Sequence, residues 1–264
     1  MTRKRTAWVA ALMVLAGLVA GAPARAGAPV RARVAADLGA RLAAAAADDS
    51  FDVLVTTLDD PAAVQRQLGV TGVTYQRALQ GFSARLTAAQ IKQLQAAAGV
   101  ETITADTPVH VTGELNERWA GTAAARSDFG ITGDGDGLLA EYSTDDVVIA
   151  IVDTGIDAGH RDLAGKVLAW KDLVNDEPEP YDDHGHGTHV AGIAAGAGAA
   201  NPALRGVAPG AALVGVKVLD KDGGAQISRV IEGIEWVLEH QAEYHIKVVK
   251  SDEGQVLRSG EYCS

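Results

Sequence analysis

An aspartate at the end of a strongly apolar stretch is the first residue whose position suits chemistry. The run from Val147 to Val152 is unbroken and rich in β-branched side chains, and Asp153 follows it directly. Such a run predicts a strand buried on both faces of a parallel sheet, and α/β folds bind ligands at the carboxyl ends of those strands. Asp153 is therefore a candidate functional carboxylate, although an aspartate that only caps the next turn would show the same pattern.

Three histidines within six residues, His184, His186 and His189, form a second candidate group. A zincin-type site needs two histidines four residues apart with a glutamate between them, and this pattern is absent. His186 and His189 could still ligate a metal, but no third ligand is in register with them. The glycines beside His186 and the small residues after it suit the start of a tightly packed helix over residues 188–196, which would let the imidazole approach a strand end.

Asp153 and His186 together fit a charge-relay pair. A buried aspartate fixes the tautomer of a histidine and stabilises its protonated form. The histidine then acts as a general base toward a hydroxyl group. The relay and metal hypotheses differ in the partner that they assign to His186.

The elements that must hold these residues alternate between strands and helices. Residues 212–219 predict a second buried strand, and residues 246–249 predict the start of a third. Alternating strands and helices predict an α/β fold with a doubly wound, mostly parallel sheet over residues 147–249. Apolar residues at helical spacing mark a crossover helix between the last two strands: Ile227, Val230, Ile231, Ile234 and Leu238.

Residues 50–111 predict a separate small α+β domain. Asp60 is placed to cap a helix that has Pro61 at its first position, and Thr87 and Gln90 form a capping box at the start of a second helix. The order β-α-β-β-α-β is ferredoxin-like, and by itself it indicates no activity. The predicted strands are 51–58, 73–79, 82–86 and 100–105.

Residues 1–26 have the features of a signal peptide. Basic residues at 3–5 precede an apolar run over residues 7–20, and Ala24-Arg25-Ala26 supplies a small-x-small cleavage pattern. The run is short for a membrane span. We therefore expect secretion without membrane attachment after cleavage, with a retained N-terminal anchor as the alternative.

Residues 112–146 predict a connector rich in glycine and charge. Within it, aspartates alternate with glycines over residues 133–137, and hard cations prefer such closely spaced oxygens. An EF-hand loop would also need Asp or Asn and then Gly where this chain has Leu138 and Leu139. A plain turn is the favoured interpretation.

The composition excludes several classes of protein. The 264 residues are 47% hydrophobic and 22% charged, which is too apolar for a disordered chain and too mixed for a multi-span membrane protein. The net charge of −11 argues against a nucleic-acid partner. A single cysteine, Cys263, allows neither an internal disulfide nor a CxxC zinc cluster.

Several of these segments, in this order and spacing, resemble the subtilisin-like serine peptidases (subtilases). The resemblance covers residues 51–249, and the segment from Ala78 to Ala84 resembles a subtilase prodomain. The motifs that carry it in the larger domain are Val152-Asp153-Thr154-Gly155-Ile156-Asp157, His186-Gly187-Thr188-His189-Val190-Ala191-Gly192, Gly206-Val207-Ala208-Pro209-Gly210-Ala211 and Val216-Lys217-Val218-Leu219.

The resemblance implies a secreted endopeptidase precursor that hydrolyses peptides or proteins. Asp153 and His186 would be the aspartate and histidine of an Asp-His-Ser triad. His189 would pack inside its helix. Gly223 and Gly224 would pair with the backbone of a bound substrate.

Two further roles follow from the resemblance. The prodomain, residues 50–111, would act as a folding chaperone and intramolecular inhibitor, with its end near His110 in the cleft until it is cut. Asp162 would ligate a structural calcium ion, and no organic cofactor is implied. The loop over residues 196–205, where the family's calcium loop lies, departs from the common pattern.

The chain also departs from the family after Val249. The expected Asn-x-Ser-x-Gly is replaced by the sequence of residues 250–254, and neither the Gly-Thr-Ser-Met-Ala nucleophile segment nor the oxyanion-hole asparagine occurs. In subtilisin, loss of the nucleophile alone lowers kcat about 10⁶-fold. We therefore expect the chain as given to be inactive, with residues 250–264 as an unrelated tail.

Three hypotheses follow from these patterns. The favoured one is a subtilase precursor that a frameshift or truncated gene has ended early, with an incomplete catalytic domain. The second is a catalytically dead inhibitor or folding helper that acts on a separate subtilase through its prodomain. The third is a metal- or ligand-binding module that uses His184, His186 and His189.

Overall fold

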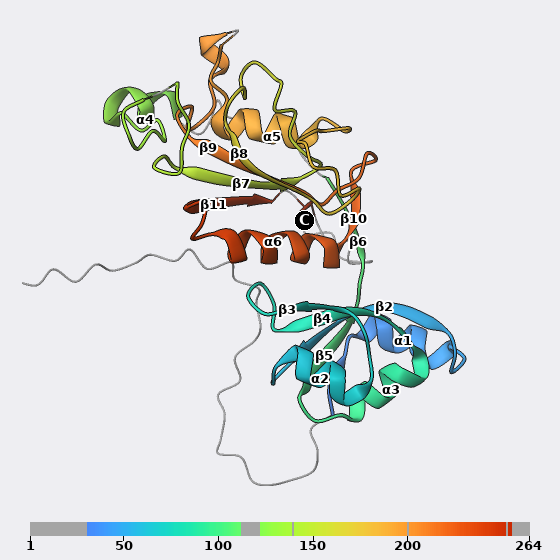
Figure 1. Cartoon of the computed structure of the whole chain (residues 1–264). Coiled ribbons are helices and arrows are strands. Elements are labelled where there is room, and N and C mark those ends of the chain that lie inside the picture. The colour runs from blue at the N-terminus through green and yellow to red at the C-terminus, as the bar shows by residue number, and fades with distance from the viewer. Residues whose placement is uncertain (1–30, 112–121, 139, 200, 252, 255–264) are drawn as a thin grey trace, which may run out of the picture.

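A parallel sheet carries the segments that hold the chemical motifs (Figure 1). The structure, a computed structural model, describes residues 31–111, 122–138, 140–199, 201–251 and 253–254. Across the sheet, the order of its strands is β11 (Ile246–Ser251), β7 (Val148–Asp153), β9 (Ala212–Lys217) and β8 (Val167–Asp172).

Helices cover both faces of this sheet, which confirms the doubly wound prediction. The helix α5 (His186–Ala195) packs on one face and α6 (Ile227–His240) on the other. Because β7 is buried at every position, its sequence is continuously apolar rather than alternating. Ile149 and Ile151 belong to the core on the α5 side, and Val148, Ala150 and Val152 belong to the core on the α6 side.

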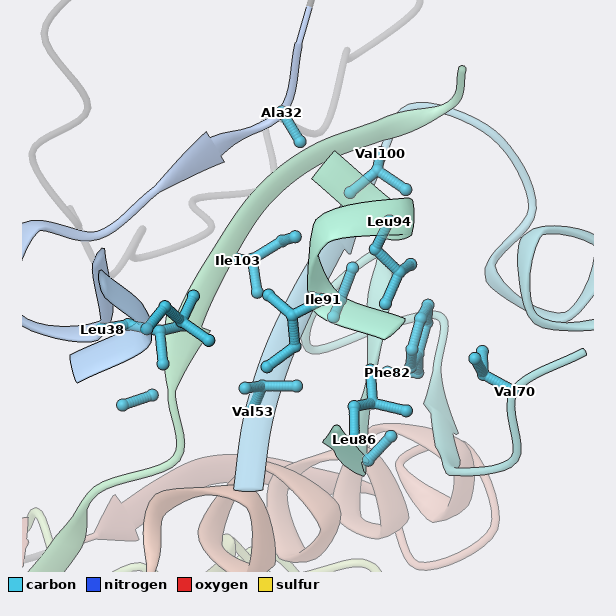
Figure 2. Packing of buried hydrophobic residues seen from close by; sticks show 14 of the residues in the cluster. Ala32, Leu38, Val53, Val70, Phe82, Leu86, Ile91, Leu94, Val100 and Ile103 are labelled. Carbon is cyan, nitrogen blue, oxygen red and sulfur yellow. The ribbon is translucent and has the colours of Figure 1, made fainter. Parts of the chain in front are cut away.

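The N-terminal part of the described chain forms the predicted ferredoxin-like unit, but the unit begins before the predicted boundary at residue 50, because residues 33–44 add a strand and a helix to it. Its helices share one core with one face of a sheet, as Figure 2 shows around Phe82, Ile91 and Ile103. The helices are α1 (Ala36–Ala44), α2 (Pro61–Leu68) and α3 (Ala88–Ala96). In spatial order, the strands are β1 (Arg33–Val34), β5 (Val100–Ala105), β2 (Ser50–Thr57), β4 (Gly81–Thr87) and β3 (Val73–Tyr75).

Both predicted helix starts are present. The Asp60 side chain accepts a hydrogen bond from the Ala63 N–H at 3.2 Å. At the second start, the Thr87 hydroxyl accepts from the Gln90 N–H, and the Gln90 side chain accepts from the Thr87 N–H. These bonds satisfy N–H groups that have no partner within the first helical turn.

The predicted strand over residues 73–79 is too long, because β3 ends at Tyr75. The backbone N–H groups of Gln76, Arg77 and Ala78 donate to the carboxylate of Glu235 on α6 instead of to a neighbouring strand. A contact with a distant element therefore ends the strand, and the local sequence could not predict it.

A short antiparallel sheet joins the two parts of the molecule. The strand β6 (Pro108–Val111) continues from the small domain and lies between β10 (Gly224–Gln226) and β12 (Glu253–Gly254). The strand β11, of which the sequence predicts the start over residues 246–249, continues to Ser251. Part of the segment expected to be an unrelated tail thus pairs with the rest of the fold through its backbone.

Part of the connector packs on the large domain. The helix α4 (Thr122–Phe129) is fixed there by Arg126, whose Nη1 donates to the carbonyl oxygen of Gly206 at 2.7 Å. The segment over residues 133–137 is a turn, in which Asp134 Oδ1 accepts from the N–H groups of Asp136 and Gly137. In the described part of the chain, no helix is both long and apolar enough to cross a membrane, and residues 1–26 lie outside that part.

A buried lysine links the connector to the parallel sheet. Lys166 is inaccessible to solvent, and its Nζ donates to the carbonyl oxygens of Pro209 at 2.6 Å and Ala211 at 3.3 Å. The same Nζ lies 3.6 Å from the centre of the Tyr142 ring. Burial lowers the pKa of Lys166 from 10.5 to about 8, because the charged form loses hydration.

This lysine makes stability depend on pH in the alkaline range. Between pH 8 and 10.5 the unfolded chain keeps a proton that the folded chain loses, so the free energy of unfolding rises with pH. We expect urea unfolding at pH 7.5 and 9.5 to show this rise in the wild type and its loss in Lys166→Met. The exposed Lys92→Met variant should behave as the wild type, whereas equal pH dependence in all three proteins would contradict the prediction.

Candidate active site

Asp153 and His186 meet at the carboxyl end of β7. The aspartate is the last residue of this strand, the histidine is the first residue of α5, and His186 Nδ1 lies 2.8 Å from Asp153 Oδ1 and 3.0 Å from Oδ2. Asp153 is 1% exposed, and the His186 side chain is 13% exposed. Because Nδ1 faces the carboxylate, a proton exchanged with a bound hydroxyl would pass through Nε2.

Two glycines allow the helix to begin so close to the strand end. A Cβ atom at Gly187 would lie 2.1 Å from the carbonyl oxygen of Gly155 and 3.1 Å from Asp153 Cβ. Gly155 has φ +124°, and a Cβ there would lie 2.1 Å from the carbonyl oxygen of Tyr181. Larger residues at either position would force the helix away from the strand and separate His186 from Asp153.

Asp182 is a site residue that sequence reasoning missed. Its Oδ1 accepts from the Thr154 hydroxyl at 2.9 Å and the Gly185 N–H at 2.8 Å, and its Oδ2 accepts from the Thr188 N–H and hydroxyl at 2.8 and 2.6 Å. The carboxylate therefore connects the turn after Asp153 to the first turn of α5. An aspartate shortly before a helix is a recognisable capping signal.

The hydrogen bonds also perturb the ionisation of Asp182. Burial alone would raise its pKa, but the bonds from the Thr188 hydroxyl and from the N–H groups of Gly185 and Thr188 hold the pKa below its ordinary value. The ionised carboxylate is thus stabilised in the folded state.

The strand β6 lies along the segment that contains Gly223 and Gly224. The Val111 N–H donates to the Gly223 carbonyl oxygen at 3.0 Å, and Gly224 is paired with His110. A Cβ atom at Gly224 would lie 3.0 Å from the His110 ring, so a side chain there would obstruct the strand. An extended peptide that adds to a sheet edge in this way is bound mainly through its backbone.

His189 does not pack inside its helix, so the expectation drawn from the resemblance is wrong in this structure. It is exposed on α5 and borders an apolar pocket of about 340 Å³ between α5 and β11. The pocket also contains Ile149, Val190 and Val248, and Val248 is 46% exposed. Within the described residues, no further element covers this side of α5 and β11, and His189 therefore faces solvent.

The three histidines do not form a metal site in the described part of the chain. His186 directs Nδ1 to Asp153, and its ring centre is 6.3 Å from that of His184 in an edge-to-face arrangement. Among the described residues, the one group of three acidic, histidine or cysteine side chains close enough to share an ion is Asp134, Asp136 and Asp146. This acidic group could hold a metal ion, and it contains no histidine.

Asp162 lies beside the loop over residues 196–205. Its Oδ1 accepts from the Ala199 N–H at 2.7 Å, and its carbonyl oxygen accepts from the Ala197 N–H at 2.9 Å. Arg205 Nε donates to the Ala197 carbonyl oxygen at 3.1 Å. The loop therefore presents N–H donors to Asp162, and Arg205 occupies a carbonyl oxygen of the loop, whereas calcium requires six to eight oxygen ligands.

Glu235 on α6 joins the small domain to the large one, and sequence reasoning missed it. It is 7% exposed, and its carboxylate accepts four hydrogen bonds of 2.6 to 2.9 Å from the N–H groups of residues 76–78. At the start of α6, the Asp106 carboxylate accepts from the Ser228 N–H and hydroxyl at 3.0 and 2.6 Å. On a helical pattern Glu235 is one polar residue among several, so no local signal marks it.

Comparison with known proteins defines the class of both parts. Residues 144–249 match the subtilase family, and residues 62–112 match the peptidase inhibitor I9 family. Residues 144–249 are therefore similar to the subtilases, the serine peptidases that the sequence motifs resemble, and a segment similar to the I9 inhibitor-type prodomain precedes them.

Individual relatives agree with this class. Serine protease AprX of Bacillus subtilis is 48% identical over 98 residues, which are 37% of this chain and 22% of the relative. Thermitase of Thermoactinomyces vulgaris is 42% identical over 95 residues, which are 36% of this chain and 34% of the relative. The chain thus spans about a quarter to a third of the length of these curated relatives.

A solved structure gives a broader but weaker match. It is fervidolysin from Fervidobacterium pennivorans, described as a keratinolytic enzyme related to subtilisin. The two chains share 24% identity with a TM-score of 0.49, over 78% of this chain and 36% of that chain.

Replacement of Asp182 tests whether its carboxylate stabilises the loop that leads into α5. We expect Asp182→Asn to lower the free energy of unfolding by about 1–3 kcal/mol, because an amide oxygen cannot replace both carboxylate oxygens as acceptors. Since the folded pKa of Asp182 lies below its ordinary value of 3.8, its stabilisation is complete above that value and is lost as the pH falls through the folded pKa.

Urea unfolding at pH 7 and pH 3 measures both effects. The difference between the wild type and Asp182→Asn should shrink at the lower pH. Asp157→Asn is the matched control. Its carboxylate is exposed, and among the described residues it accepts a hydrogen bond only from the Gly159 N–H. Equal stability of wild type and Asp182→Asn at pH 7 would contradict the prediction.

Proposed function

We propose that this chain is a secreted subtilisin-like serine endopeptidase precursor that hydrolyses peptide bonds through an Asp-His-Ser triad. The observations that carry the proposal are the Asp153–His186 hydrogen bond at a strand end and the antiparallel pairing of β6 with β10, which begins at Gly224. Asp153 and His186 supply two members of the triad. The serine and the oxyanion-hole asparagine are not among the residues of this sequence, so the chain as given is proposed to be inactive.

Each described residue has a defined part in the proposed reaction. Asp153 holds the imidazole through Nδ1 and stabilises it when protonated, and His186 accepts the proton of the serine hydroxyl as general base. His186 then returns the proton to the leaving amine. Gly223 and Gly224 bind the substrate backbone in the position that β6 takes here.

The prodomain is proposed to inhibit in the same molecule by occupying the cleft. Its strand β6 fills the substrate position, and the contacts of Glu235 and Asp106 hold the domain on α6. These contacts support an intramolecular inhibitor, because a peptide tethered to its own cleft binds at a high effective concentration.

Secretion belongs to the same proposal, whereas a structural calcium ion at Asp162 does not. Secretion rests on the signal-peptide pattern of residues 1–26. A calcium ion at Asp162 is implied by the family resemblance, but the surroundings of Asp162 supply hydrogen-bond donors where calcium needs oxygens, so they fit the ion poorly. No step of the proposed reaction passes through a metal.

A chimeric enzyme tests the catalytic assignment. Residues 1–249 would be joined to the remaining catalytic part of Bacillus subtilis AprX, and hydrolysis of a chromogenic peptide would be measured after maturation. We expect activity in the chimera, a loss of about 10⁴-fold in kcat for Asp153→Asn because the imidazole takes the wrong tautomer, and a loss of about 10⁶-fold for His186→Ala.

An exposed histidine away from the apolar pocket supplies the matched control. His160→Ala should keep kcat within a few-fold of the chimera, since this side chain is exposed between β7 and β8 and does not line the pocket beside His186. Full activity of a folded Asp153→Asn chimera would overturn the assignment of the pair.

A second candidate function is inhibition of a separate subtilase. The supporting observation is that the small domain has a hydrophobic core of its own, which contains no residue of the large domain. In this structure α6 covers the surface of the small domain that would bind another protease, and β6 is already paired with β10. Inhibition of a separate protease therefore requires the small domain to detach from Glu235 of its own chain.

We therefore expect Glu235→Ala to inhibit a purified subtilisin at lower concentration than the wild-type chain, because it loses the four hydrogen bonds that hold residues 76–78. The measurement is the rate of peptide hydrolysis at increasing concentrations of each chain. Glu239→Ala, an exposed glutamate one turn further along α6, should match the wild type. No inhibition by any of the three folded chains at micromolar concentration would remove this candidate function.

A further inference from the structure

Lys217 is a fully buried charge that the proposed reaction does not use. It is the last residue of β9 and is paired in register with Asp153 on β7. Its Nζ donates to the carbonyl oxygens of Thr154 and Leu219 and forms an ion pair of 2.6 Å with Asp183 Oδ1. A buried ammonium group is costly unless it is paired and hydrogen-bonded, so these acceptors must all be in place.

The three acceptors belong to three different parts of the candidate site. Thr154 directly follows the catalytic aspartate. Asp183 lies three residues before His186, on the loop that leads into α5. Leu219 begins the segment that continues to Gly223 and Gly224. One ammonium group therefore connects the end of β7, the loop before α5 and the segment that leads to Gly223 and Gly224.

The ion pair adds a second constraint to the loop that Asp182 already holds. The Asp183 side chain is 34% exposed, whereas Lys217, with which it forms the ion pair, is inaccessible to solvent. The Tyr181 ring lies over the ammonium group, with its centre 5.1 Å from Nζ. The loop between Tyr181 and His186 is therefore drawn toward a fixed point at the end of the sheet.

We propose that Lys217 is a positioning residue for the Asp153–His186 pair and that it acts through Asp183. This inference rests on the proposed function, because it assigns Lys217 a task in the same site. Asp182 fixes the start of α5 to Thr154 through neutral donors, and Lys217 adds a charged contact that sets where the preceding loop lies relative to β7. Without this contact, His186 remains the first residue of α5, but the distance between its Nδ1 atom and the Asp153 carboxylate is no longer constant.

The full chain can be tested without any catalytic activity. The readout is the proton resonance of the His186 Nδ1–H in ¹⁵N-labelled protein, which moves downfield and resists exchange when it is hydrogen-bonded to a carboxylate. We expect this resonance in the wild type and its loss or broadening in Lys217→Met. Because removal of a buried charge can disturb folding, Asp183→Asn is the second variant, and we expect it to reduce the intensity at least twofold while the fold is retained.

Two controls separate this role from a general effect on stability. Lys221→Met removes an exposed lysine from the neighbouring loop and should leave the resonance unchanged. Thermal unfolding of each variant, followed by circular dichroism, reports stability independently. Lowered stability with an unchanged His186 resonance in both Lys217→Met and Asp183→Asn would show that Lys217 is only structural and would overturn the proposal.

The failure of the proposed function has a different signature. If the wild type shows no hydrogen-bonded Nδ1–H resonance that Asp153→Asn abolishes, the Asp153–His186 pair itself does not exist in solution, and both proposals fall. If that resonance is present and responds to Asp153→Asn but not to the Lys217 and Asp183 variants, the positioning role alone is rejected.

Discussion

The candidate site depends on one close backbone contact, the approach of the first turn of α5 to the turn that follows β7. Gly187 and Gly155 make this contact possible, since a Cβ atom at either would lie about 2.1 Å from a carbonyl oxygen. Once the backbones are this close, His186 lies within hydrogen-bond distance of Asp153. Asp182 and Lys217 then hold the intervening loop through separate contacts, one as an acceptor of neutral donors and the other as a buried cation.

The helix α6 has a comparable role for the molecule as a whole. Its apolar stripe packs on the parallel sheet, and Val230 and Val237 belong to that core. Its opposite side carries Glu235, which binds the backbone of the small domain (Figure 1). One helix therefore completes the core of the large domain and holds the small domain in the position from which β6 pairs with β10.

Several features could be predicted from the sequence because their causes are local. The capping box at Thr87 and the continuous apolar run of β7 reflect interactions within a few residues or burial on both faces. The end of β3 and the exposure of His189 could not be predicted in this way. The first depends on Glu235, which is about 160 residues distant in the chain, and the second depends on which elements cover the outer side of α5.

The sequence by itself determined the resemblance to the subtilases, because the Asp153 and His186 motifs occur in the order and spacing of that family and a prodomain pattern precedes them. It also determined that the nucleophile segment of that family is not among these residues. Only the tertiary structure decided that the two motifs form a hydrogen-bonded pair, that β6 lies against Gly223 and Gly224, and that Lys217 joins three parts of the site. The physical reason is that each of these contacts unites residues from separate strands and loops, whose distance in space depends on how the sheet packs rather than on the residues beside them in the chain.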